Sequence, residues 1–525
     1  MKKSALEGLP APTIEYIKSL ETRIDQLTEM LLLAQKARFG SSSEKSKYLL
    51  KDGFEQESLF NEAEAYANDN EPDPVIVEKH TRKSKRTKEE LAKDLPVQEI
   101  VVDIPEDKRI CNICECGLHA IGRELVRREL NIIPAQAYIT ETYRINYSCD
   151  TCKEETDDAN IIKAQVPEPV VKRGLASPSS VAYTMYQKYV NAMPLNRQAK
   201  DWETFGVIIS RATLANWVIY ASMHWLLPLW SALKAVLVQS IVILADESVL
   251  QVLKEPGKTP QSESRMWVYC NGNTGQPSIT LFEYQPNRSG DHPQRFLEGA
   301  SSFYLLTDGY SGYNKVKNAT HCGCFAHMKR KFTDALPKTE KSDSKAAQGI
   351  AFCDKLFLLE REFKELPHEE RLKKRLKHSK PVLDAFFAWV ETVNPLAGSK
   401  LGEAITYAKN QKVPLSAILL DGRIDLSTNR IENQIRPFAV GRRNYLFADT
   451  VNGARASAIV YSIIQTAAAN GLNPFLYLVF LFTELPTALT KNPDIDLSPF
   501  FPWNAEIQEK CKFTQGPKGQ LSLLT

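Results

Sequence analysis

The chain has 525 residues, and its 66 Lys and Arg nearly balance its 63 Asp and Glu, giving a formal net charge of +3. One hydrophobic core rarely extends over this length, so we expect about three or four domains. Apolar residues (43%) and charged residues (25%) are present in the proportions of an ordinary globular protein. The near-zero total charge excludes a nucleic-acid function based on net charge, so such a function would have to rest on where the charges lie.

Three features of the sequence bear on the compartment. The first residues, MKKSALEGLPAPTIEY, lack the apolar segment of a signal peptide. The most apolar window, 225–245, is interrupted by Pro228 and Lys234, which predicts a helix end and a buried strand rather than a membrane span. Ten cysteines, four of them in two CxxC pairs, suit a reducing interior. We therefore expect a cytoplasmic protein.

Apolar residues recur at alternating steps of three and four near the N-terminus. They are Ile17, Leu20, Ile24, Leu27, Leu31 and Ala34. This spacing predicts either a short coiled coil that pairs protomers or one amphipathic helix packed on its own chain. We assign 1–50 to this helix and 51–95 to a charged linker. The linker contains a basic run at 79–88, which either contacts DNA phosphates or is only solvated.

Two CxxC pairs lie within 96–165, which we expect to form a small zinc-binding domain with strands such as Ala137–Asn146. The four expected ligands are Cys111, Cys114, Cys149 and Cys152. Four thiolates suit a tetrahedral structural zinc ion, and they leave no open position for catalysis. Cys116 is an alternative to Cys114 as a ligand, and four unliganded cysteines are the other interpretation.

The next region, 166–238, has a helical pattern and contains a possible helix-turn-helix. Two helical segments, 195–205 and 210–221, are separated by Gly206 and Val207. We expect Ser210 to cap the second helix. Arg211, Thr213 and Asn216 would then face outward toward DNA. A plain helical hairpin fits the same pattern.

From residue 240 the pattern changes to strands, which follow 241–244, 266–270, 279–284 and 303–307. Asp246 follows the first run, and Asp308 follows the fourth. This order is typical of a ribonuclease-H-like sheet. We expect a catalytic core over 239–470 with a helical insertion at about 337–418, and a C-terminal helical segment over 471–525.

The stretch 420–447 predicts a helix that begins after Ser427 or Thr428 as N-cap. Helical spacing places Glu432 and Arg436 on one face, and we expect a basic loop at 441–444. Taken alone, this pair could be an ordinary solvated ion pair.

Three carboxylates in this order, Asp246, Asp308 and Glu432, can serve phosphoryl transfer with two divalent ions, Mg²⁺ or Mn²⁺. Each Asp could instead be only a strand-end turn residue. Because Glu247 lies one residue after Asp246, we expect it to face the other side of the strand. Several cations are expected to hold DNA phosphates. They are Arg288, His327, Lys329, Arg330, Arg436, Arg442 and Arg443.

The sequence resembles the large transposase of the insertion sequence 66 family over nearly its whole length. The matching motifs include the paired CxxC, SRATLANWV, ADESVLQVL, YQPNRSGDHP, LLTDGYSGYN, GCFAHMKRKF and LSTNRIENQIRPFAVGRRNYLF. Many members carry Asp-Asn-Asn before the glutamate, where this chain has Ser427-Thr428-Asn429. Since Ser and Thr also cap helices, we expect the position of Glu432 to be little affected.

The resemblance implies that Asp246, Asp308 and Glu432 form the acidic triad of a DDE transposase. It also implies a bacterial, nucleoid-associated enzyme that recognises terminal inverted repeats and works with two small companion proteins. We expect a homodimer or higher oligomer, because two DNA ends must meet in one complex. Two other classes fit the residues: a catalytically silent DNA-binding regulator derived from a transposase, and a general nuclease of the same fold.

Overall fold

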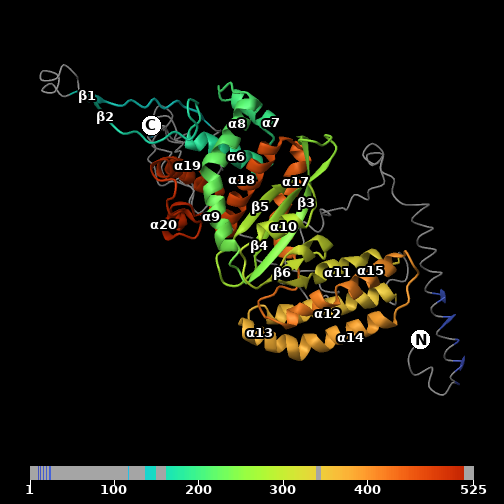
Figure 1. Ribbon diagram of the computed structural model, residues 1–525. Coiled ribbons are helices and arrows are strands. Elements are labelled where there is room, and N and C mark those ends of the chain that lie inside the picture. The colour runs from blue at the N-terminus through green and yellow to red at the C-terminus, as the bar shows by residue number, and fades with distance from the viewer. Residues whose placement is uncertain are drawn as a thin grey trace. The chain divides into compact units, whose positions relative to one another are not determined.

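The computed structural model describes residues 10, 12–13, 16, 19–20, 23–24, 116, 136–148, 161–337 and 344–512. The chain divides into two units, 1–35 with 135–513 and 36–134 with 514–525, and the helices and strands described below belong to the first. The fold is mixed α and β, with helices around a mixed sheet (Figure 1).

The central sheet has the order β5-β4-β3-β6-β7, with antiparallel pairing among β3, β4 and β5 and parallel pairing from β3 to β6 and β7. Its strands are β3 (Val242–Lys254), β4 (Glu263–Asn271), β5 (Thr280–Gln285), β6 (Phe303–Thr307) and β7 (Ala319–Gly323). A short strand, β8 (Ala448–Thr450), pairs parallel with the far end of β3. The four strand runs expected from the sequence are confirmed, whereas β7 was not expected because ATHCG is short and only partly apolar.

The strand β3 is longer than its apolar start predicts. It continues through Asp246 to Lys254, so Asp246 lies within the strand instead of at its end. The parallel pairing with β6, however, ends at Leu244. Antiparallel pairing with β4 continues to Gln251 and keeps the second half of β3 extended. Asp246 therefore lies two residues beyond the point at which β3 and β6 stop pairing.

The edge strand β5 is covered by α18 (Val451–Ala469), whose hydroxyl groups take the place of a further strand. Ser462 Oγ accepts a 2.7 Å hydrogen bond from the Phe282 N–H. Thr466 Oγ1 accepts from the Thr280 N–H at 3.1 Å and donates to its carbonyl oxygen at 2.9 Å. These bonds satisfy backbone groups that an open edge would leave available for aggregation.

A helical region precedes the sheet in the sequence. It comprises α6 (Pro178–Tyr189), α7 (Leu195–Glu203), α8 (Arg211–Ala221), the π-helix η3 (Ser222–Leu226) and α9 (Leu227–Leu237). The capping role of Ser210 is confirmed, since its hydroxyl accepts a hydrogen bond from the Thr213 N–H at 3.0 Å. The helices α7 and α8 contact each other and both contact α6. C-terminal helices follow, and α19 contacts α6. They are α19 (Pro474–Lys491), η7 (Ser498–Phe500) and α20 (Ala505–Lys510).

The segment between β7 and residue 420 is helical, as expected, and its longer helices gather in one group (Figure 1). It comprises α11 (Phe325–Asp334), α12 (Lys345–Phe363), α13 (His368–Lys374), the π-helix η5 (Arg375–Ser379), α14 (Lys380–Thr392), α15 (Lys400–Asn410), α16 (Lys412–Ser416) and η6 (Ala417–Leu419). Phe332, Phe386 and Trp389 form mutual ring contacts in its core. Two short elements lie earlier, between β5 and β7. They are α10 (Asp291–Phe296) and η4 (Ser311–Lys315).

Two local expectations are wrong. Only Asn146 of the expected strand Ala137–Asn146 belongs to a strand, β1 (Asn146–Ser148), which pairs with β2 (Ile161–Lys163). Tyr138 and Tyr143 are 79% and 81% exposed. Alternating apolar and polar residues form a strand only where a neighbouring strand or a core packs against them, and among the described residues the rest of this segment has neither. The expected loop at 441–444 is helical instead, because α17 (Asn429–Tyr445) continues through Pro437 and Gly441.

Several expectations fall partly or wholly outside the described residues. These are the four CxxC cysteines and the 51–95 linker. Of the proposed coiled coil, Leu20 and Ile24 are described, and both are helical and exposed. In the part of the chain that the structure describes, no helix combines the length and apolarity needed to cross a membrane.

Candidate functional site

Asp246 and Asp308 lie equally far beyond the paired segment of two neighbouring parallel strands. The last aligned pair of β3 and β6 is Leu244 and Leu306. Asp246 lies two residues further along β3, and Asp308 lies two residues further along the chain, just after β6 ends at Thr307. Parallel neighbours are about 4.8 Å apart. The register therefore places both aspartates beyond the same end of the paired segment.

The backbone after Asp308 turns sharply, and this turn is held at both ends. Gly309 has φ +92°, a conformation that glycine adopts without strain. The Tyr310 N–H donates a 2.9 Å hydrogen bond to Asp308 Oδ1. From α15 of the insertion, the Tyr407 hydroxyl donates a 2.8 Å bond to the Asp308 carbonyl oxygen. The helical insertion thus contributes directly to the position of this aspartate.

Glu432 reaches the site from α17, which packs against β3. Ile431 and Ile435 are fully buried on the packed face, as expected from the helical spacing. Thr428 precedes the helix, but its side chain does not cap the backbone. Its hydroxyl instead donates a 2.8 Å hydrogen bond to Glu432 Oε1. The expected N-cap position, Thr428, is therefore confirmed, but its hydroxyl orients the Glu432 carboxylate instead of capping the backbone.

The charges of these three carboxylates interact. Burial raises the pKa of Asp246 well above its usual value, and the charges of Glu247, Asp308 and Glu432 raise it further. Such mutual repulsion is relieved by a cation, and an all-carboxylate oxygen set suits Mg²⁺. The charges of Asp308 and Glu432 therefore reach Asp246, but in the described part of the chain these three carboxylates are not a group whose ligand atoms all lie within 4.8 Å of one another.

Glu247 follows Asp246 in the paired part of β3 and so points to the other face, as expected, but its charge still acts on Asp246. Its side chain is only 3% exposed, and Arg288 Nε donates a 2.5 Å hydrogen bond to Oε1. The Tyr313 hydroxyl donates to Oε2 at 2.8 Å. Arg288 Nη2 also lies 4.0 Å from Asp308 Oδ2. Burial and the charge of Asp308 raise the pKa of Glu247, while Arg288 and Tyr313 oppose that rise.

The cations expected to bind DNA differ in their surroundings. Arg330 Nη2 lies 3.7 Å from Glu432 Oε2. Lys329 Nζ pairs with Asp354 Oδ1 at 2.8 Å, and Arg442 donates to the Val249 carbonyl oxygen. Arg443 is exposed, and Arg436 is half-buried. Their binding to DNA stays a prediction.

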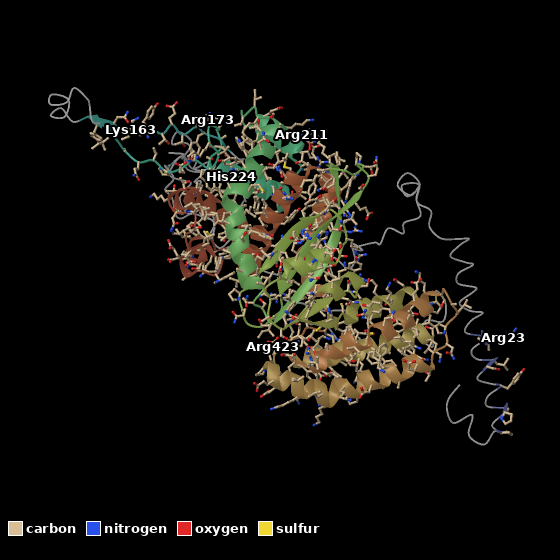
Figure 2. All side chains as sticks on the ribbon, in the orientation of Figure 1. Arg23, Lys163, Arg173, Arg211, His224 and Arg423 are labelled. Carbon is tan, nitrogen blue, oxygen red and sulfur yellow. The ribbon has the colours of Figure 1, made fainter. Side chains whose placement is uncertain are left out.

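The expected DNA-reading residues of the helical hairpin lie on α8. Arg211 and Asn216 are exposed and Thr213 is half-buried, as the outward orientation requires. Figure 2 marks Arg211 at the start of this helix. Leu214 and Trp217 are buried on the opposite face.

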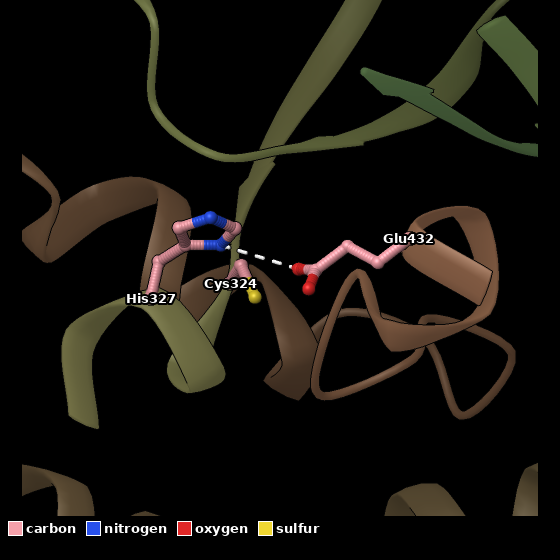
Figure 3. Close-up of side chains that lie close together, drawn as sticks. All are labelled: Cys324, His327 and Glu432. Carbon is pink, nitrogen blue, oxygen red and sulfur yellow. Dashed lines mark ion pairs between the residues drawn. The ribbon is translucent and has the colours of Figure 1, made fainter. Parts of the chain in front are cut away.

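A group that the sequence analysis missed lies beside Glu432. In the described part of the chain, the His, Cys, Asp and Glu side chains whose ligand atoms all lie within 4.8 Å of one another are Cys324, His327 and Glu432 (Figure 3). Burial alone would lower the pKa of His327, but Cys324, Glu432 and Asp308 outweigh it and raise the pKa to about 9. The spacing Cys324-x2-His327 was visible in the sequence, but the third residue of the group, Glu432, lies 105 positions after His327.

Comparison with known families identifies the chain. The model described as "Transposase IS66 family" matches residues 173–456, which is more than half of the sequence. The chain belongs to the IS66 family of transposases. The model of the "zinc-finger binding domain of transposase IS66" matches 108–153, a span that includes all four expected zinc ligands. A third model, "Transposase C of IS166 homeodomain", matches 26–100 and includes the segment expected to be a linker.

Curated relatives from Sinorhizobium fredii (strain NBRC 101917 / NGR234) resemble the chain over most of its length. "Uncharacterized protein y4qI" is 28% identical over 93% of this chain and 90% of its own. "Uncharacterized protein y4jD" is 27% identical over 83% and 86%, respectively. The resemblance of this chain to the family therefore extends well beyond the span of the main family model.

Proposed function

We propose that the protein is a DNA transposase whose acidic triad is Asp246, Asp308 and Glu432. The observation that carries this proposal is that both aspartates lie two residues beyond the last aligned pair of β3 and β6, with the charges of Asp308 and Glu432 raising the pKa of Asp246. The order β5-β4-β3-β6-β7, with three antiparallel strands followed by parallel ones, supports a ribonuclease-H-like core. Membership of the IS66 family supports the same reaction class.

The carboxylates would hold two Mg²⁺ ions, with Mn²⁺ as a substitute. Two such ions, when bound, supply charge stabilisation to the attacking and leaving oxygens of an in-line displacement. Asp246 would contribute oxygens from β3, Asp308 from the turn after β6, and Glu432 from α17. The 2.8 Å hydrogen bond from the Thr428 hydroxyl would hold the Glu432 carboxylate in the orientation that metal binding requires.

Two chemical steps follow at this site. Water hydrolyses a phosphodiester at the element end, which leaves a 3′-OH and a 5′-phosphate. The 3′-OH then attacks a phosphodiester of target DNA, so that one bond forms as another breaks. The zinc-finger region and the exposed residues Arg211 and Asn216 of α8 would recognise the inverted repeats.

The remaining expectations belong to the same proposal. A structural zinc ion on Cys111, Cys114, Cys149 and Cys152 is supported by the family model that spans them. Pairing of protomers through a coiled coil is supported by the exposed, helical Leu20 and Ile24. Two small companion proteins would complete the complex with DNA.

A cleavage and joining assay tests the proposal. Purified protein is mixed with Mg²⁺ and labelled DNA that carries the element ends, with and without the companion proteins. Glu432→Gln should abolish nicking, whereas Glu403→Gln, which changes an exposed carboxylate paired with Lys400, should not. Tight binding without cleavage in the presence of the companions would favour a silent DNA-binding regulator. Cleavage without joined products would favour a general nuclease.

A further inference from the structure

Cys324, His327 and Glu432 meet where two helices begin. Cys324 immediately precedes α11, His327 lies on its first turn, and Glu432 lies on the first turn of α17. The two helix starts are joined by backbone contacts. The Phe325 N–H donates to the Leu426 carbonyl oxygen at 3.1 Å, and the Thr428 N–H donates to Cys324 Sγ at 3.2 Å. These bonds hold the starts of the two helices, and with them the three residues, next to each other.

The distances within this group are close to those of a tetrahedral metal site. Zinc bonds of about 2.0–2.3 Å place neighbouring tetrahedral ligands about 3.3–3.8 Å apart. His327 Nδ1 lies 3.8 Å from Glu432 Oε1, and all three ligand atoms lie within 4.8 Å of one another. Shifts of about one ångström or less would thus bring all three into contact with one ion.

A fourth polar atom borders the same space. Thr428 Oγ1 lies 3.1 Å from Cys324 Sγ and 3.4 Å from His327 Nδ1. It also lies 2.8 Å from Glu432 Oε1. A hydroxyl is a weak zinc ligand, so this corner suits a hydroxyl or a water molecule beside three protein ligands.

The two oxygens of Glu432 face different neighbours. Oε2 lies 3.7 Å from Arg330, whereas Oε1 faces Thr428 and His327. Cys324 is fully buried, but the side chains of His327 and Glu432 are 22% and 14% exposed. Cys324 is therefore the most deeply buried of the three, and His327 and Glu432 are the members that solvent reaches (Figure 3).

The donor types discriminate between metals. A thiolate and an imidazole favour zinc over magnesium, which prefers oxygen ligands. We propose that Cys324, His327 and Glu432 bind a zinc ion, distinct from the zinc expected on the CxxC cysteines. While this zinc is bound, the Glu432 carboxylate is not available as a ligand for Mg²⁺. The second half of this proposal rests on the proposed transposase function. Zinc binding releases the thiol proton and any imidazole proton to solvent.

The binding test uses the full chain without DNA. Protein carrying one equivalent of zinc in its CxxC site is titrated with Zn²⁺ by calorimetry, in the presence of excess Mg²⁺. The wild type should bind a second equivalent. Loss of a residue that only supports a metal ligand lowers metal affinity by about 10–100-fold. In Cys324→Ala and His327→Ala, the affinity for the second zinc should fall by more than this. Cys353→Ala, which changes another buried cysteine on α12, should keep the second equivalent.

A spectroscopic probe identifies the ligand. With zinc retained in the CxxC site, added Co²⁺ should produce a thiolate-to-cobalt absorption band in the wild type and in Cys353→Ala. The band should be absent in Cys324→Ser, whose near-isosteric side chain preserves the fold, as circular dichroism can check. A wild type that binds a single zinc, or a second zinc and cobalt band that survive in both site variants, would overturn the proposal.

The catalytic consequence is measured separately. Added zinc should slow Mg²⁺-dependent DNA cleavage by at least about tenfold in the wild type and in Cys353→Ala. It should leave the cleavage rate of Cys324→Ser almost unchanged. Binding of a second zinc by a protein that cleaves no DNA would defeat only the transposase proposal. Normal cleavage with no second zinc would defeat only the zinc site.

Discussion

Arg288 donates a 2.5 Å hydrogen bond from Nε to the buried carboxylate of Glu247. The same guanidinium lies 4.0 Å from Asp308 Oδ2 and 4.0 Å from the centre of the Tyr310 ring. Arg288 is therefore an internal counter-ion of the acidic group. This placement explains how several carboxylates can lie close together in the protein before a metal ion binds.

Replacement of Arg288 by Ala should destabilise the metal-free protein. We expect a loss of about 1–2 kcal/mol at pH 8, below the value for a fully buried pair because Arg288 is 41% exposed. Glu247 already has a raised pKa, and loss of Arg288 raises it further, so the variant takes up a proton as the pH falls. The deficit should therefore shrink toward pH 5. Urea unfolding at both pH values measures it, with Arg288→Lys as the charge-preserving control. An equal deficit at both pH values would contradict this role.

Thr428 should matter for catalysis through its hydroxyl group. Thr428→Val removes the hydrogen bond to Glu432 Oε1. Bonds to charged groups contribute about 1.5–3 kcal/mol, so we expect end cleavage to slow by about tenfold or more. Thr428→Ser keeps the hydroxyl and should retain most of the rate. Cleavage rates over a range of Mg²⁺ concentrations test this, and equal rates for the Val and Ser variants would argue against it.

Arg375 should be important for the stability of the helical insertion. It is fully buried, pairs with Glu360 at 2.6 Å and donates to the carbonyl oxygens of Ile418, Asp421 and Ile424. Arg375→Met leaves these groups without their donor, and we expect a loss of about 3–5 kcal/mol in the free energy of unfolding. Lys374→Met, at the exposed neighbouring position, should change it by less than about 0.5 kcal/mol. Denaturant titration of both variants tests the difference.

Glu283 on β5 should make stability depend on pH. Burial raises its pKa from 4.5 to about 7, although Gln285, Lys234 and Arg295 oppose this rise. Between these values the folded protein holds a proton that the unfolded chain has lost. Stability should therefore fall by up to about 3 kcal/mol as the pH rises from 4.5 to above 7.

The matched variants of Glu283 isolate this effect. Glu283→Gln should remove that part of the pH dependence and stabilise the protein above pH 7, while Glu298→Gln, at an exposed position, should not. Thermal melting from pH 4 to pH 8 measures both. A Glu283→Gln protein whose melting profile follows that of the wild type would show that the carboxylate is already solvated.

The local sequence predicted much of the fold. Continuous apolar runs indicated four strands of the sheet, and the Ser210 cap and the Ile431–Ile435 stripe indicated helices that the structure contains. These signals are local, because strand and helix periodicity are determined by neighbouring residues. The order of the acids along the chain was also visible, and it led to Asp246, Asp308 and Glu432.

Other features depended on contacts between distant segments. The strand β7, the burial of Glu247 under Arg288, and the continuation of β3 past Asp246 all required partners that local patterns do not reveal. The group of Cys324, His327 and Glu432 arises only because the starts of α11 and α17 hydrogen-bond to each other. The sequence by itself determined which residues could carry the chemistry. Tertiary packing decided which of them meet, because side-chain proximity and charge interaction depend on distance in space rather than along the chain.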